Sequence, residues 1–189
     1  INGAVSAGIG DALAQAQDDD EVRAVVLTGA GDKSFSAGAD LKAIANQENV
    51  YHPEHPEWGF AGFVQHFIDK PVIAAVNGTA LGGGTEIALA SDLVIAEQRA
   101  QFGLPEVKRG LIAGAGGVFR IIDQLPRKVA LELLYTGEPI SAADAARRCC
   151  SRITTWRSSS GRAPPTAAPP PGSSGPARCC RWPVPSAPC

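Results

Sequence analysis

The sequence contains no methionine, and its first 148 residues contain no cysteine. Because the chain of 189 residues opens on Ile1, we interpret its start as an internal point of a longer protein. All five cysteines lie from Cys149 onward, whereas secreted disulfide scaffolds distribute cysteines through their fold. The two vicinal pairs lack zinc-knuckle spacing and have no nearby histidine. These features predict a reducing, cytoplasmic setting.

Long apolar runs are also missing, and no basic segment followed by an apolar stretch opens the chain. We therefore expect neither a membrane span nor a secretory signal. Acidic residues are absent after Asp144. Residues 147–189 carry seven arginines and no acidic residue. The remainder has ten basic and 19 acidic residues, a net charge of −9. An acidic body argues against nucleic acid as the main partner.

The end of the chain differs in composition from the rest. Residues 151–189 contain nine prolines, seven serines and no leucine, too little apolar surface to offset chain entropy. We predict a core domain over residues 1–146 and a low-complexity tail over 147–189, disordered or non-native. One hypothesis is that the tail is an out-of-frame reading of GC-rich DNA; the alternative is a natural basic linker. Resequencing distinguishes them, since an uninterrupted frame contradicts the first.

Hydrophobic patterning in the body predicts an α/β fold. Short apolar runs rich in β-branched residues at 22–27, 71–76 and 92–96 are typical of buried strands. Segments with helical spacing lie between them, including one up to residue 16 and one expected over 60–68. Strands alternating with helices indicate parallel pairing.

A glycine-rich turn at residues 82–84 follows one of these strands and opens a helix. Free N–H groups at such a position can hold a phosphate or a developing oxyanion, although tight packing explains glycines equally well. Glu86 lies in the first helical turn and Glu106 follows an apolar turn. Each alone is readily a capping or surface acid. Two acids near one glycine-rich turn could also divide general acid and base roles.

Three blocks, in order, resemble those of the crotonase (enoyl-CoA hydratase) family, and the resemblance covers residues 1 to about 148. The blocks are FSAGADLK at 35–42, KPVIAAVNG at 70–78 continuing to LGGGTE at 81–86, and QFGLPE at 101–106 followed by GLIAGAGG at 110–117. This resemblance implies a crotonase-like core, a superhelix of ββα units. It also implies that regions normally present at both ends are missing here.

The resemblance implies site residues at matching positions. The backbone N–H groups of Ala39 and Gly83 would hold the thioester oxygen of an acyl-CoA, since such donors favour the developing enolate. Glu86 would deprotonate the attacking water, and Glu106 would protonate Cα. The other positions expected to contact substrate or CoA are Ala37, Asp40, Leu41, Lys42, Gly82 and Gly114.

The resemblance implies no separate cofactor, because coenzyme A is part of the substrate. The three histidines, His52, His55 and His66, have spacings that do not fit a metal site on one helix face, and we predict none. Their loop borders the acyl pocket by family position. Trp58, Phe60 and Phe63 could therefore shape substrate choice, with core packing as the alternative for the two phenylalanines.

The leading functional prediction is reversible hydration of a 2-enoyl-CoA to a 3-hydroxyacyl-CoA. Residues 58–110 also resemble bacterial carnitinyl-CoA dehydratases, which catalyse a related dehydration. One alternative is double-bond isomerisation, which needs one glutamate rather than two. Another is an acyl-CoA binder or an inactive fragment. The expected partner is an acyl-CoA thioester, with a homotrimer or dimer of trimers if the C-terminal region were intact.

Overall fold

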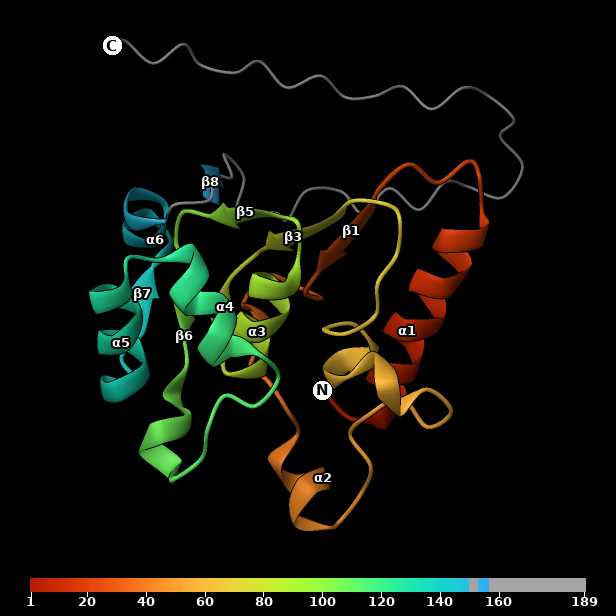
Figure 1. The fold of residues 1–189 in the computed structure, drawn as a ribbon, viewed down its shortest axis with the longest axis horizontal. Helices are drawn as coiled ribbons and strands as arrows, with labels where there is room; N and C mark the ends of the chain where they lie inside the picture. The colour runs from red at the N-terminus through yellow and green to blue at the C-terminus, as the bar shows by residue number, and fades with distance from the viewer. Residues whose placement is uncertain (150–152, 157–189) are drawn as a thin grey trace, which may run out of the picture.

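The structure is a computed structural model in which residues 1–149 and 153–156 are described. It contains two four-stranded sheets (Figure 1). The first sheet has the order β1 (Val25–Thr28), β3 (Val72–Val76), β5 (Leu93–Glu97) and β8 (Ile153–Trp156). The second has the order β2 (Ser34–Ser36), β4 (Thr79–Leu81), β6 (Gln101–Gly103) and β7 (Ile140–Ser141).

Helices connect the strands. The α-helices are α1 (Gly3–Asp18), α2 (Leu41–Ala45), α3 (Gly83–Ala90), α4 (Gly117–Gln124), α5 (Arg127–Thr136) and α6 (Ala142–Arg148). The 3₁₀ turns are η1 (Pro56–Trp58), η2 (Phe60–Gly62) and η3 (Pro105–Arg109). In Figure 1, α1 lies on one side of the molecule, α5 and α6 lie on the other, and α3 and α4 lie between them.

The chain alternates between the two sheets before each crossover helix. β1 and β2 precede α2, β3 and β4 precede α3, and β5 and β6 precede η3 and α4. Among the described residues, every strand pair is parallel except β6 with β7. Such winding produces a superhelix of ββα units, and the predicted α/β fold with parallel pairing is confirmed.

Small and β-branched residues form the inner face of the first sheet. Ala74, Val76 and Ala96 are fully buried there, and Ile87 of α3 belongs to the same cluster. A second cluster joins η3, α4 and α5 through Leu104, Ile121, Leu125 and Leu133. Burial of this apolar surface, at about 25 cal/mol per Å², holds α3 against both the sheet and α4.

The prediction of a helix over residues 60–68 is wrong. The chain makes only the short η2 turn, and inside it Ala61 has a left-handed φ of 61°. Gly59 and Gly62 also have positive φ, at 73° and 62°, a conformation that no α-helix accommodates. The apolar spacing that suggested a helix reflects a compact turn that buries Phe60 and Phe63.

The last helix, α6, begins with a side-chain cap. The Ser141 hydroxyl accepts a 3.1 Å hydrogen bond from the Asp144 backbone N–H. α6 continues to Arg148, and β8 then pairs with β5, so part of the segment 147–189 is a strand of the first sheet. The rest of the predicted tail lies outside the described residues. Within the described ranges, no helix is sufficiently long and apolar to span a membrane.

Candidate active site

The N-terminus of α3 is fixed by a hydroxyl. Thr85 Oγ1 lies 2.8 Å from the Ala80 carbonyl, 2.9 Å from the Gly103 carbonyl and 3.0 Å from the Gly103 N–H. The Gly82 N–H also donates to Gly103 at 2.9 Å. These contacts attach the first turn of the helix to β4 and β6. The leading N–H groups of a helix have no intrahelical acceptor and carry partial positive charge, so this end favours an anion.

The loop before α2 approaches α3 closely at Gly38. A Cβ placed on Gly38, which has a φ of +91°, would lie 2.8 Å from the Gly83 nitrogen. Only glycine therefore allows this approach. The Gly38 carbonyl accepts from the Ile1 nitrogen, and the Asp40 N–H donates to the Ile1 carbonyl.

The two predicted oxyanion donors, Ala39 and Gly83, thus flank one close contact between the loop and the helix. Neither belongs to a strand. Across residues 1–149 and 153–156, neither N–H donates to another backbone carbonyl. Both amides therefore remain available for an oxygen of a ligand. Their role in holding a thioester oxygen is still a prediction.

Glu86 is a buried carboxylate in the first turn of α3, with 4 % of its surface exposed. Its Oε1 accepts a 2.9 Å hydrogen bond from the Gly117 N–H. Burial raises the pKa of Glu86, and repulsion from Glu106 raises it further. The backbone N–H groups of Gly117 and Ala115 and the positive charge of Arg120 act in the opposite direction.

Glu106 extends from η3 toward the same helix end. Its Oε1 would lie 3.0 Å from a Cβ on Gly82, whose φ of +55° also favours glycine. Its Oε2 is buried and has no hydrogen-bond partner among the described residues. Burial raises the pKa of Glu106, while its own backbone N–H lowers it. Because Gly82 is the N-cap of α3 and Glu86 lies in its first turn, the two glutamates are at the same end of this helix.

The other predicted contacts are spread around this site. The Ala37 carbonyl lies near Gly82, 4.0 Å from where a Cβ would stand. Asp40 caps α2, since its carboxylate accepts from the backbone N–H of Lys42 at 3.0 Å and of Ala43 at 3.2 Å. The residues Leu41, Lys42 and Gly114 are exposed. Their roles in CoA binding stay predictions.

The three histidines gather around Trp58. Its ring stacks between those of His55 and His66, at 4.1 and 3.9 Å, and meets the edge of His52 at 4.8 Å. The same ring packs on Gly10 of α1. Both faces of Trp58 are therefore covered, and its packing anchors η1 to α1.

Phe60 lies at the site itself. Its Cε1 would be 2.4 Å from a Cβ on Gly83, so the phenyl ring rests directly on the backbone of that glycine. Phe63 is buried in the core cluster. Of the three aromatic residues predicted to shape the pocket, Phe60 is thus the one in contact with a predicted oxyanion donor.

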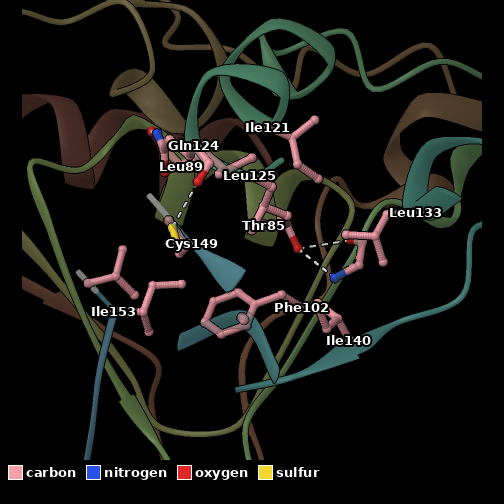
Figure 2. A pocket seen from close by; sticks show the side chains of 14 residues that line it. Thr85, Leu89, Phe102, Ile121, Gln124, Leu125, Leu133, Ile140, Cys149 and Ile153 are labelled. Atoms are coloured by element: carbon pink, nitrogen blue, oxygen red, sulfur yellow. Dashed lines mark hydrogen bonds between the residues drawn. The ribbon is translucent and has the colours of Figure 1, made fainter. Parts of the chain in front are cut away.

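A partly open apolar pocket of about 40 Å³ lies beside α3 (Figure 2). Its lining includes Phe102, Ile121, Leu133 and Ile153, and the Thr85 hydroxyl is already bonded. Figure 2 also shows the Cys149 thiol, which bonds the Gln124 carbonyl at 3.2 Å. Neither glutamate is among its lining residues, so this pocket is separate from the candidate site.

Sequence reasoning missed Gly117 and Arg120. The Gly116–Gly117 pair at the start of α4 is visible in the sequence, but the hydrogen bond from Gly117 to Glu86 spans 31 residues. Arg120 reaches the Ala115 carbonyl at 2.9 Å and the Val64 carbonyl at 2.6 Å. No local pattern indicates that a helical arginine contacts a segment 56 residues earlier.

Two carboxyls and two open amides around one helix end suit acyl-thioester chemistry, and comparison with known proteins agrees. Residues 1–150 match the enoyl-CoA hydratase/isomerase family, and the chain belongs to that family. The structure resembles that of a carnitinyl-CoA dehydratase from Mycobacterium avium 104, with 73 % identity and a TM-score of 0.82 over 85 % of this chain and 62 % of that one.

Proteins with lower sequence identity to this chain have names from the same family. An enoyl-CoA hydratase from Mycobacterium tuberculosis H37Rv is 42 % identical with a TM-score of 0.76, over 85 % of this chain and 62 % of that one. The carnitinyl-CoA dehydratase of Salmonella enteritidis PT4 is 45 % identical over 148 residues, 78 % of this chain and 56 % of that protein. The chain therefore spans little more than half the length of the curated relatives it matches. The crotonase-like fold predicted from the sequence is confirmed.

Proposed function

We propose that this chain carries the reaction centre of a hydro-lyase that reversibly adds water to a 2-enoyl-CoA thioester. The observation that supports this most is the pair Glu86 and Glu106, both withdrawn from water at the N-terminus of α3. Hydration needs one group to take a proton from water and another to deliver one to carbon. The names of the relatives, enoyl-CoA hydratase and carnitinyl-CoA dehydratase, support the same class.

The environments of the two glutamates suggest how they divide these roles. Gly117, Ala115 and Arg120 all favour the ionised form of Glu86. Glu106 has only its own backbone N–H to favour ionisation, and its Oε2 lacks a partner among the described residues. The family resemblance assigns Glu86 as the base and Glu106 as the acid. The hydrogen bond from the Gly117 N–H to the Glu86 carboxylate supports the first of these roles, because it favours the ionised form.

In the proposed step, the Glu86 carboxylate removes a proton from water while the water oxygen bonds to Cβ. The electrons of the double bond move toward the thioester carbonyl, and the N–H groups of Ala39 and Gly83 stabilise the enolate oxygen. Cα then takes the proton of Glu106. One H and one OH have been added, with no change of redox state. Dehydration is the same path in reverse.

An isomerase of the same family is the second candidate. It moves one proton between two carbons of the substrate and needs one carboxylate. The presence of two carboxyl groups at the N-terminal end of α3, Glu86 in its first turn and Glu106 beside Gly82, therefore favours hydration. The alternative of a binder or inactive fragment rests on the partial coverage of the relatives.

Crotonyl-CoA provides the test, because hydration removes the absorbance of its conjugated thioester. We expect Glu86→Gln and Glu106→Gln each to lower kcat by about 10²-fold to 10⁴-fold. Glu132→Gln is the matched control, since Glu132 is exposed on α5. Unchanged turnover in both site variants contradicts the mechanism. CoA binding without turnover supports a binder, and activity only in a version extended to the relatives' length supports an inactive fragment.

The assembly and location of the protein stay predictions. We infer a homotrimer or dimer of trimers for the complete protein, and a cytoplasmic location. Sedimentation of this chain beside an extended version tests the first of these. A monomer in both cases contradicts it.

A further inference from the structure

Arg120 connects two parts of the site that lie far apart in the sequence. It extends from α4, one turn after Gly117. Its Nη1 donates to the Ala115 carbonyl at 2.9 Å, and its Nη2 donates to the Val64 carbonyl at 2.6 Å. A guanidinium is planar and its donors are fixed relative to each other. Holding both carbonyls therefore sets the position of one relative to the other.

The first carbonyl belongs to the turn that holds Glu86. Ala115 comes two residues before Gly117, whose N–H is bonded to the Glu86 carboxylate. The guanidinium also fills the space beside Gly116, where a Cβ would lie 2.1 Å from Nη1. Arg120 thus folds back over the turn that leads into its own helix. A shift of this turn would move the donor on which the orientation of Glu86 depends.

The second carbonyl belongs to the segment that covers Gly83. The Val64 N–H bonds the Phe60 carbonyl at 3.2 Å, and the Phe60 ring rests on the Gly83 backbone. Arg120 therefore links the surroundings of the predicted base with those of a predicted oxyanion donor. Either link alone would be ordinary structural packing. Together they join the two groups whose relative placement the reaction requires.

We propose that Arg120 is a positioning residue for the reaction, which fixes the turn that orients Glu86 and the segment that places Phe60 on Gly83. This role rests on the proposed hydratase function. The residue does not touch the reacting atoms. It acts through the position of the Glu86 carboxylate and through the position of the Phe60 ring that packs on Gly83. It is distinct from the two glutamates and from the amides that bind oxygen.

Charge gives this role a signature that packing alone lacks. The charged groups that act on Glu86 are Arg120, which lowers its pKa, and Glu106, which raises it. Replacing Arg120 by a neutral side chain leaves burial and Glu106 unopposed except for the backbone donors. The pKa of Glu86 then rises, and the acid limb of the kcat profile moves to higher pH. An arginine whose charge lay too far from Glu86 to act on it would leave both unchanged in a variant that folds.

The test uses the whole chain with Arg120→Gln and Arg120→Lys, and Arg127→Gln as the control because Arg127 is exposed on α5. Carbon NMR of labelled glutamate carboxyls follows the titration of Glu86, assigned with Glu86→Gln. We expect a higher Glu86 pKa in Arg120→Gln and little change in Arg120→Lys, which keeps the charge. With crotonyl-CoA, kcat falls by about 10-fold to 100-fold in Arg120→Gln while KM changes little.

Hydrogen exchange of the Gly117 amide is a measurement that requires neither enzymatic activity nor the Arg120→Gln variant. We expect faster exchange in Arg120→Lys than in Arg127→Gln, because a lysine reaches only one of the two carbonyls. Unchanged Gly117 exchange in Arg120→Lys, or an unchanged Glu86 titration in folded Arg120→Gln, overturns the proposal. A wild-type chain that never hydrates crotonyl-CoA contradicts the proposed function instead, and the titration and exchange still decide the role of Arg120.

Discussion

The Gly117 N–H donates a 2.9 Å hydrogen bond to the carboxylate of Glu86, so the N-termini of α3 and α4 meet at one acid. Glu86 is in the first turn of α3, and Gly117 is the first residue of α4. The bond crosses between two ββα units and connects the core cluster of the first sheet with the one around α4 and α5. The geometry of Glu86 therefore depends on how these clusters pack together.

Gly117→Ala is expected to abolish this arrangement. The added Cβ would lie 2.8 Å from the Glu86 Cγ, 2.9 Å from its Oε1 and 3.2 Å from the Ala113 Cβ. The carboxylate must then move, and we expect hydration of crotonyl-CoA to fall by about 10²-fold, as for other small displacements of a catalytic group. Steady-state kinetics measures this.

Gly8→Ala on α1 is the matched control, because a Cβ there has nothing within 4 Å. It should leave kcat unchanged and stabilise the helix by about 0.5–1 kcal/mol. Equal kinetics for Gly117→Ala and Gly8→Ala would show that Glu86 does not depend on the turn into α4.

Glu106→Gln is expected to stabilise the fold at neutral pH. Burial raises the pKa of Glu106, so its contribution to stability is present below the ordinary pKa of a glutamate, about 4.3, and is lost as the pH rises through the higher value of the folded state. Removing the charge should raise the free energy of unfolding by about 1 kcal/mol at pH 7. Urea unfolding at several pH values measures it.

The gain from Glu106→Gln should disappear on acidification, once the wild-type carboxyl is protonated in both states. Glu132→Gln, at an exposed position, should show neither the gain nor its pH dependence. A gain that is constant down to pH 4 would mean that charge is not its source.

Gly83→Ala and Phe60→Ala should be coupled. An alanine Cβ at position 83 would lie 2.4 Å from the Phe60 Cε1 and 2.6 Å from its Cζ, so the single variant should be destabilised by about 1–3 kcal/mol. Phe60→Ala removes the obstacle but leaves a cavity, at a cost of about 3–5 kcal/mol. The double variant should be less destabilised than the two single costs combined. Additive costs would show that the ring and the glycine do not touch.

The sequence predicted the parts of the fold that local patterns encode. β3 and β5 are continuous apolar runs and were found at nearly their observed bounds, although Leu93 and Ile95 leave one face of β5 exposed. Strands β2, β4 and β6 have only three residues each, too few to show any period, and were missed. The turn at residues 60–62 buries apolar residues at helical spacing without being an α-helix.

The candidate site likewise has a part that local sequence patterns predict and a part that they do not. Glu86 and the glycines before it form one short motif, so their proximity could be predicted locally. The family resemblance placed Glu106 beside them, and its Oε1 lies 3.0 Å from where a Cβ on Gly82 would stand; the catalytic role of Glu106 stays a prediction. The support from Arg120, Gly117 and Phe60 depends on contacts across 56, 31 and 23 residues, which no local pattern shows.

His52 should be a structural acceptor whose loss destabilises the η1 loop. It is 2 % exposed, and its Nδ1 accepts hydrogen bonds from the backbone N–H groups of Glu54 at 3.1 Å and His55 at 2.9 Å. The proton therefore resides on Nε2, which lies 3.2 Å from the Asp11 carboxylate. His52→Leu leaves two donors without an acceptor and should cost about 2 kcal/mol. His52→Asn, whose amide oxygen can accept at a similar position, should cost less, and Asp11→Asn should cost under about 1 kcal/mol because Asp11 is exposed. Thermal unfolding ranks the three, and an equal cost for the leucine and asparagine variants would show that the accepted hydrogen bonds contribute nothing.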